Sequence, residues 1–164
     1  MANLEPLIQS IPVAPLKLAS LEGCRTLADQ VNNYLVSFRH ESPTNVGQAD
    51  SLQGYCADSY LLECECPRFG SGEGKGVLKE SVRGCDLFIM VDVTNYSLTY
   101  RVNGYENHMS PDNHYQDLKR IISAADGKAR RINVIMPFLY EGRQHKRSKR
   151  ESLDCALMLQ ELVD

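Results

Sequence analysis

The sequence lacks any apolar run approaching the roughly 20 residues that a membrane-spanning helix requires. Its amino terminus also lacks a cationic segment followed by an apolar block, which is the pattern of a secretory signal. The sequence also lacks an excess of positive charge, since its net charge is −3 at pH 7. A protein with this charge is not a general nucleic-acid binder. These absences predict a cytoplasmic protein that has neither a membrane nor a nucleic acid as its partner.

The composition is that of an ordinary globular protein, with 43% hydrophobic and 24% charged residues. The 164 residues are the length of one domain, so we expect residues 1–164 to form a single domain. A chain of this size buries roughly 70% of the surface that it exposes when unfolded, which is enough for a substantial core.

Six cysteines could form disulfides or bind a metal, but their context favours buried free thiols. Cys64, Cys85 and Cys155 lie within apolar segments, and the chain is not one of the small loop-rich proteins that depend on disulfides. Cys64 and Cys66 have the two-residue spacing that places both thiols on one face of a strand. No further ligands stand near them at a suitable spacing, so we expect no metal site.

Segments with strand and helix patterns alternate along the chain. Strands are predicted at residues 12–19, 60–66, 77–82, 85–93 and 131–136. Helices are predicted after Ser20 as N-cap, between Pro111 and Gly127, and from Leu153 to the carboxyl end. This alternation predicts an α/β fold, in which a largely parallel sheet is flanked by helices on both faces.

Apolar stripes support the first two helices. The helix after Ser20 has a stripe formed by Cys24, Leu27, Val31, Tyr34, Leu35 and Phe38. The helix after Pro111 has a stripe formed by Tyr115, Leu118, Ile121, Ile122 and Ala125. The strand at 85–93 is apolar throughout its middle, as expected of a central strand covered on both faces.

Two polar excursions interrupt this pattern, at residues 40–53 and 94–111. The first is expected to be a poorly ordered loop. The second contains the turn signal Asn103–Gly104 after alternating apolar and polar residues, so it predicts a small hairpin. We interpret His108 and His114 as surface histidines rather than as a metal pair, because they span the boundary between this excursion and the next helix.

The strand at 131–136 is expected to be buried, because Ile132, Val134, Ile135 and Met136 form a short apolar run, and Pro137 ends it. A basic segment, RQHKRSKR at residues 143–150, follows this strand. Five of its eight side chains are cationic: Arg143, Lys146, Arg147, Lys149 and Arg150. The carboxyl ends of strands are where open α/β sheets bind ligands, so an anionic ligand is expected here. A solvated surface is the alternative interpretation of the same charges.

A glycine tract, PRFGSGEGKG at residues 67–76, connects two predicted strands, so we expect a glycine-rich hairpin there. Its four glycines lack the lysine and hydroxyl arrangement of a P-loop, which favours a flexible hairpin over a phosphate cradle. Phe69 on such a hairpin would offer an uncrowded face for stacking on a base, although a lone aromatic residue can also belong to the core.

Four segments, in order and spacing, resemble the ribose-phosphate pyrophosphokinases, also called phosphoribosyl-pyrophosphate synthetases. They are RFGSGEG followed by KESVRG, then GCDLFIMVDV, DNHYQDLKRIISAADGKA and RRINVIMPFLYEGRQHKRSKRES. The resemblance is specific from Tyr60 onward and is to the amino-terminal domain. It implies a type I phosphoribosyltransferase-like fold and a homo-oligomer. It also implies transfer of the diphosphoryl group of Mg·ATP to ribose 5-phosphate, giving phosphoribosyl pyrophosphate and AMP.

The resemblance also assigns roles to particular residues. It implies an ATP site formed by Phe69, Ser71, Glu73, Arg143, Gln144 and His145. It implies a regulatory phosphate site formed by Ser81 and Arg83, although Arg83 can also be a simple surface arginine. These roles suit the chemistry, because an arginine such as Arg143 can fork onto phosphate oxygens. Magnesium would come with ATP, and its protein ligands would lie mostly outside this chain.

Three departures from the family pattern bear on activity. His145 stands where an acidic residue is usual, Ser71 stands where an amide is usual, and the basic segment is one residue short before Arg150. The family's metal-binding histidine segment, catalytic loop and ribose-phosphate loop would lie beyond Asp164, so we expect no catalytic residue here and no activity of this chain alone. The alternatives are a non-catalytic regulatory homologue that assembles with active subunits, and an anion- or RNA-binding module.

Overall fold

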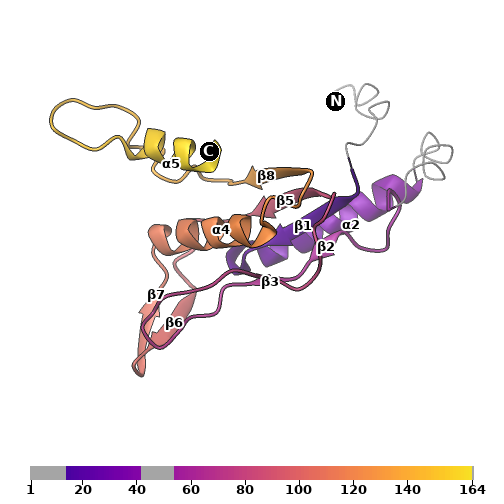
Figure 1. Cartoon of the computed structure of the whole chain (residues 1–164), viewed down its shortest axis with the longest axis horizontal. Coiled ribbons are helices and arrows are strands. Elements are labelled where there is room, and N and C mark those ends of the chain that lie inside the picture. Colours follow the sequence, from indigo (N-terminus) through magenta and orange to yellow (C-terminus); the bar gives the residue numbers. More distant parts are fainter. Residues whose placement is uncertain (1–13, 42–53, 164) are drawn as a thin grey trace.

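The main sheet contains four parallel strands in a computed structural model that describes residues 14–41 and 54–163. The strands are β1 (Leu16–Ser20), β2 (Leu61–Leu62), β5 (Asp86–Met90) and β8 (Arg131–Ile135), in the order β2-β1-β5-β8 (Figure 1). Within the described ranges, no helix is both long and apolar enough to cross a membrane. Nearly all of the predicted loop at 40–53 lies outside these ranges.

β5 is the centre of the sheet, as its apolar sequence predicts, because β1 pairs with it on one side and β8 on the other. Side chains alternate along it, so that Leu87 and Ile89 face one layer while Phe88 and Met90 face the other. The strand at 131–136 was expected to be buried, and this prediction is wrong. Among the described residues, β8 pairs with β5 alone, its terminal residues Arg131 and Ile135 are exposed, and its middle residues are only partly buried.

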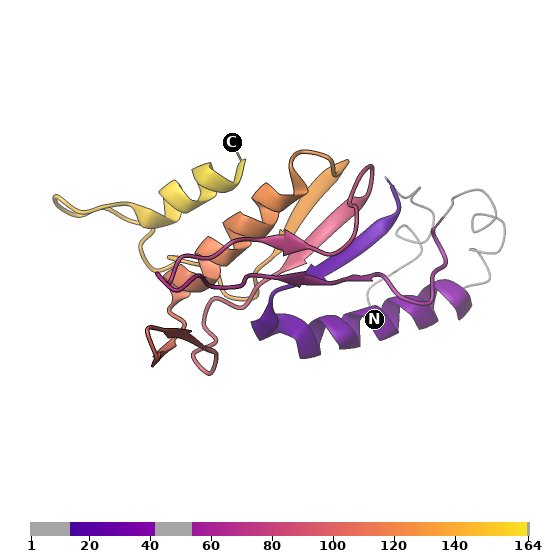
Figure 2. The same cartoon turned by 60° about the horizontal axis from the view of Figure 1, so that its bottom comes forward.

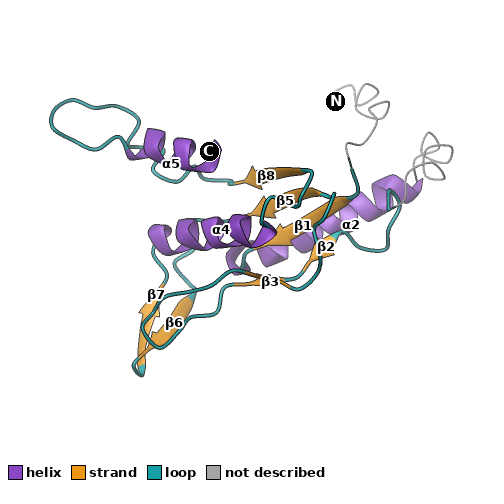
Figure 3. Cartoon of the chain, viewed as in Figure 1, coloured by secondary structure: helices purple, strands orange, loops and turns teal. Residues whose placement is uncertain are grey.

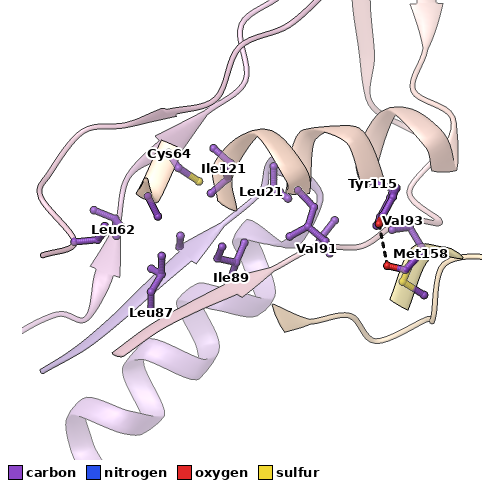
Figure 4. Close-up of a cluster of buried hydrophobic side chains, with 14 residues drawn as sticks. Leu21, Leu62, Cys64, Leu87, Ile89, Val91, Val93, Tyr115, Ile121 and Met158 are labelled. Atoms are coloured by element: carbon purple, nitrogen blue, oxygen red, sulfur yellow. Dashed lines mark hydrogen bonds between the residues drawn. The ribbon is translucent and has the colours of Figure 1, made fainter. Parts of the chain in front are cut away.

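Helices cover both faces of the sheet, which confirms the predicted α/β architecture. Figure 2 shows α2 (Arg25–Glu41) on one face and α4 (Pro111–Ala125) on the other. α5 (Asp154–Val163) lies on the same side as α4 and places Met158 in the core. The larger hydrophobic cluster therefore lies between β5 and α4, as Figure 4 shows.

The first helix differs from its prediction in two ways. A 3-10 turn, η1 (Glu22–Cys24), comes before α2, and Leu21 rather than Ser20 occupies the N-cap position of this turn. The hydroxyl of Ser20 donates to the Leu21 carbonyl and caps no amide. The predicted stripe is also displaced, because the helix buries Ala28 and Asn32 and leaves Tyr34 exposed. Asn32 is tolerated there because its Oδ1 accepts the Tyr60 amide at 2.8 Å.

α4 forms as its sequence predicts. Pro111 begins it after Ser110, whose hydroxyl caps the Asn113 amide, and the helix ends at a left-handed Asp126 before Gly127. The members of its predicted stripe that become fully buried are Tyr115, Leu118, Ile121 and Ala125.

Two small antiparallel pairs extend from the main sheet at its carboxyl end. The predicted strand at 60–66 divides, because Leu61 and Leu62 pair with β1 whereas β3 (Cys64–Glu65) pairs with β4 (Val77–Leu78). The hairpin predicted around Asn103–Gly104 is confirmed as β6 (Thr99–Val102) and β7 (Tyr105–His108). Figure 3 shows this hairpin standing away from the main sheet, below the amino-terminal end of α4.

Candidate functional site

Three of the predicted ATP-binding residues lie together on one tight turn, residues 67–76, which we name the Phe69 turn. Arg68 and Gly74 form an antiparallel bridge, and the Phe69 amide donates to the Glu73 carbonyl at 2.7 Å. The ring of Phe69 is 53% exposed, and Ser71 donates its hydroxyl to the Glu73 carboxylate at 2.7 Å. The turn therefore presents an aromatic face and a carboxylate side by side to solvent.

Beneath the turn lies a group of charges, the buried pair Arg68 and Asp117 with the partly exposed Arg120, which we name the charge cluster. Arg68 donates to both carboxylate oxygens of Asp117, at 2.7 and 2.8 Å, and Arg120 donates to one of them at 2.6 Å. The side chains of Arg68 and Asp117 are only 8% and 6% exposed. The hydrogen bonds that Arg68 donates to Asp117 are the main reason that the pKa of Arg68 is raised, so the guanidinium stays charged.

The neighbours of the charge cluster close around Arg68. The guanidinium of Arg68 lies over the ring of Tyr100 on β6, 5.3 Å from its centroid. The Cys66 thiol also packs here, and burial together with the Asp117 carboxylate raises its pKa to about 12. All six cysteines are free thiols. Cys64 and Cys155 are buried, as predicted, whereas Cys85 is only partly buried.

Two glycines of the turn permit this close packing. A Cβ added at Gly74 would clash with the guanidinium groups of Arg68 and Arg120, and one added at Gly76 would clash with the backbone of Arg120. The strand that returns from the turn therefore lies directly against α4. Glycine is needed at these two positions because the returning strand lies so close to α4 that a side chain would not fit between them.

The other three predicted ATP-binding residues begin the segment 143–150, which we name the basic loop. It follows the carboxyl end of β8, as predicted, and Figure 1 shows it extending away from the sheet beyond α5. Gln144 is fixed by a hydrogen bond from its side chain to the Ser152 carbonyl at 2.9 Å. His145 Nδ1 lies 3.2 Å from the Gly142 carbonyl, and Arg143 is exposed. Within the described part of the chain, the guanidinium of Arg143 forms no hydrogen bond and no ion pair.

The basic loop is attached to α4 at its base, through aromatic rings. Tyr140 stacks on Tyr115 of α4, with 4.4 Å between ring centroids, and donates its hydroxyl to Asp112 at 2.7 Å. Tyr115 in turn donates to Glu161 of α5 at 3.0 Å. Burial and these carboxylate partners raise the pKa of both phenols above their usual value. The Phe69 turn and the basic loop therefore share α4 as their support but lie on different sides of it (Figure 1).

The residues of the predicted regulatory site lie at the opposite end of the sheet. Ser81 and Arg83 are both exposed, and the Arg83 amide donates to the Ser81 hydroxyl at 3.3 Å. They precede β5, so they lie at its amino end, whereas the Phe69 turn and the basic loop lie toward the carboxyl ends of the strands.

The structure corrects the prediction that His114 lies on the surface, and it reveals polar residues of α4 that the sequence prediction missed. His108 is exposed as predicted, but His114 is only 3% exposed, with Nε2 2.6 Å from the Asn95 carbonyl. His114 and Asp117 lie three residues apart and in step with Ile121, so both share the buried side of α4. Polar residues at these helical positions were the signal that could have identified a buried polar cluster. In the described part of the chain, no three His, Cys, Asp or Glu side chains gather as a metal site would require.

Comparison with known proteins gives a consistent result. A family model described as the N-terminal domain of ribose phosphate pyrophosphokinase matches residues 16–164. Among solved structures, phosphoribosylpyrophosphate synthetase from Mycobacterium smegmatis is similar with a TM-score of 0.56 and 22% sequence identity. The match covers 91% of this chain but 39% of that one, so the chain spans well under half of that protein's length. No curated protein sequence gives a significant match.

Proposed function

Because the chain belongs to the ribose phosphate pyrophosphokinase family, we propose that it is the ATP-contributing N-terminal domain of a ribose-phosphate diphosphokinase. The complete enzyme would transfer the diphosphoryl group of Mg·ATP to the 1-hydroxyl of ribose 5-phosphate, giving phosphoribosyl pyrophosphate and AMP. The observation that carries this proposal is the family match, which extends over nearly the whole chain. We place this enzyme in the cytoplasm and expect it to act as a homo-oligomer.

The two exposed elements suit the two ends of a nucleotide. Because they lie on different sides of α4 (Figure 1), one ATP would contact both where the Phe69 turn of one subunit meets the basic loop of its neighbour in the homo-oligomer. Phe69 has the exposed ring that an adenine can stack on, with Ser71 and Glu73 beside it to accept or donate hydrogen bonds at the base edge. Arg143 has an unengaged guanidinium in the described structure, and such a group can bind two phosphate oxygens at once. Gln144 and His145 lie next to it, with His145 supplying a further ring nitrogen.

The role of this chain in the reaction is to bind and orient ATP. Transfer breaks the bond between the α- and β-phosphoryl groups, and the 1-hydroxyl oxygen of ribose 5-phosphate forms a new bond to the β-phosphorus as AMP leaves. In phosphoryl transfer, positioning and neutralisation of charge supply most of the catalysis. The cations of the basic loop can supply the neutralisation. Magnesium would come with ATP, as part of the Mg·ATP substrate.

The site for ribose 5-phosphate belongs mainly to the part of the enzyme that this chain does not contain. Ser81 and Arg83 are proposed to bind a regulatory phosphate at the other end of the sheet. Their separation from the Phe69 turn and the basic loop is compatible with a site that does not compete directly with ATP.

A second candidate function is that of a non-catalytic regulatory homologue that assembles with active synthetase subunits. His145 favours it, because a histidine stands where the family has an acidic residue. Such a homologue would bind ATP without forming AMP.

The test is titration calorimetry of the chain with Mg·ATP, comparing Phe69→Ala with Tyr105→Ala. Tyr105 is a matched control, since it is another exposed aromatic residue, on the neighbouring hairpin. Loss of a stacked base is worth about 1–3 kcal/mol, so Phe69→Ala should weaken binding about 5- to 140-fold while the control leaves it unchanged. Equal affinities would remove Phe69 from the site.

A competition experiment separates nucleotide binding from simple anion binding. Tripolyphosphate carries the charges of the ATP tail without the base, so it should displace ATP only at a much higher concentration if the base is recognised. Equal competition would indicate an anion-binding loop. An assay of the complete gene product for AMP formation that depends on ribose 5-phosphate then separates the enzyme from the regulatory homologue.

A further inference from the structure

The charge cluster is buried, although charged groups are expensive to remove from water. Asp117 accepts three hydrogen bonds from two guanidinium groups, and none of the three donor distances exceeds 2.8 Å. The Asp117 side chain is 6% exposed, and that of Arg68 is 8% exposed. Buried ion pairs seldom stabilise a fold more than apolar residues of the same volume would. A cluster of this kind therefore calls for an explanation other than stability.

The geometry of the cluster supplies that explanation. A bidentate pair between a planar guanidinium and a carboxylate fixes the direction of both groups, which apolar packing does not do. Arg68 directly precedes Phe69 and also forms the backbone bridge with Gly74 that closes the turn. Its guanidinium is further confined by the ring of Tyr100, 5.3 Å away. Holding Arg68 in this way also holds the base of the Phe69 turn.

We propose that Asp117 is a positioning residue, which acts through Arg68 to hold the Phe69 turn in one orientation on α4. Neither residue needs to touch the ligand. The effect on the nucleotide rests on the function proposed above, whereas the effect on the turn does not. The exposed ring of Phe69 would thus be presented in a fixed orientation, so that little conformational entropy is lost when a base stacks on it.

The chain has no tryptophan, so Phe69→Trp creates a single fluorescent reporter on the turn itself. In that background, time-resolved anisotropy without nucleotide measures how freely residue 69 moves. Adding Asp117→Asn should increase the amplitude of fast depolarisation, because the charge that orients Arg68 is lost. The control is Asp126→Asn, which removes the same charge from an exposed ion pair with Lys128 at the carboxyl end of the same helix. It should leave the decay unchanged.

A second variant separates orientation from stability. Asp117→Asn leaves Arg68 buried without its counter-charge and can unfold the chain. The double variant Arg68→Met/Asp117→Leu removes both charges of the buried pair and keeps an apolar contact. Arg120 stays charged, but its side chain is 21% exposed and can turn to solvent, so the variant should fold. With the charges gone, we expect a folded protein whose residue 69 is still mobile. A double variant that is folded and as rigid at residue 69 as its parent would overturn the proposal, and so would an unchanged decay in a folded Asp117→Asn variant.

Nucleotide binding gives the functional readout. Base stacking contributes about 5- to 140-fold to affinity, and a ring that is not held in place loses part of this. We therefore expect the Kd for Mg·ATP to rise about fivefold or more in both cluster variants and to stay constant in the Asp126→Asn control. Equal Kd values in parent and cluster variants would overturn the link between the cluster and the ligand. If the Phe69→Trp parent shows no response to Mg·ATP, the proposed function fails, and the anisotropy comparison still decides whether Asp117 positions the turn.

Discussion

The Phe69 turn and the basic loop are attached to the same helix by different means. The turn is fixed along its length by the charge cluster, by the bridge between Arg68 and Gly74, and by direct contact of Gly76 with α4. The loop is held near its ends, by the stacked ring of Tyr140 before it and by Gln144, whose side chain donates to the Ser152 carbonyl and whose own carbonyl accepts the Cys155 amide. The cationic side chains between these attachments are exposed.

This difference shows how two parts of one proposed site can meet different requirements. A flat base is recognised by a surface whose orientation is already set, which favours a rigid support. A polyphosphate with magnesium is recognised by charge, and long arginine and lysine side chains can adjust to it. The cost of that adjustment is the side-chain entropy that is lost when the ligand binds. Four predictions test the comparison.

The largest loss of stability is expected where the turn is anchored. Asp117→Ala leaves Arg68 and Arg120 without their shared carboxylate, and breaking a buried pair in this way costs about 3–5 kcal/mol. Urea denaturation should show a lower midpoint with an unchanged slope. A loss below about 1 kcal/mol would show that the charge cluster is hydrated rather than buried, and the contrast with the basic loop would disappear.

The next effect concerns the approach of the turn to the helix. Gly76→Ala adds a methyl group where the backbone of Arg120 already lies, and such overpacking costs about 1–3 kcal/mol. Gly70 is the matched control, because an added Cβ there meets nothing within 4 Å. Gly70→Ala should change the free energy of unfolding by no more than about 0.5 kcal/mol. Thermal or urea denaturation of the two variants gives the comparison, and equal losses would contradict the close packing.

A smaller effect is expected at the base of the loop. Tyr140→Phe keeps the stacked ring but removes the hydrogen bond to Asp112, which is worth about 0.5–1.5 kcal/mol. Tyr105→Phe is the control, because that phenol is 76% exposed.

The same variant has a pH signature. The raised pKa of Tyr140 means that the folded protein keeps a proton that the unfolded chain loses above pH 10, so stability is fully present below that pH and decreases above it. Denaturation midpoints measured at rising pH should fall less steeply in Tyr140→Phe than in the parent. Parallel curves would show that Tyr140 titrates normally.

The smallest change in stability is expected within the loop. Arg143→Ala should alter the free energy of unfolding by less than about 0.5 kcal/mol, because the side chain is exposed, yet it should weaken Mg·ATP binding. Arg101→Ala removes another exposed arginine, on β6, and should change neither quantity. Calorimetric titration and thermal unfolding of both variants provide the data. A substantial loss of stability in Arg143→Ala would mean that the loop is packed as firmly as the turn.

The sequence predicted the layers of the fold well, because they depend on local patterns. The apolar run of β5, the capped start of α4 at Pro111 and the Asn103–Gly104 hairpin all formed where the residues indicated. Predictions failed where distant contacts decide. Nothing near residue 60 shows that the strand divides after Leu62, since the division depends on pairing with β1 and β4.

The same limit applies to the candidate site. The residues of the Phe69 turn and the basic loop could be named from short segments and from the family resemblance. Asp117 could not, because its partner Arg68 lies 49 residues away and only the folded chain brings them together. The helical position of His114 indicated that it shares the buried side of α4, but its partner, the carbonyl of Asn95 in the neighbouring excursion, could not be read from the sequence.

The open side of β8 has a consequence for handling the protein. Within the described part of the chain, the backbone amides and carbonyls on that side pair with no other strand, and such a row is a template for intermolecular strand pairing. Charged side chains at an edge oppose this pairing. Arg131 supplies one at the start of β8, where Asp86 on the adjacent strand holds its guanidinium at 2.6 and 2.9 Å. This one ion pair therefore also helps to determine how long a concentrated solution stays free of aggregates.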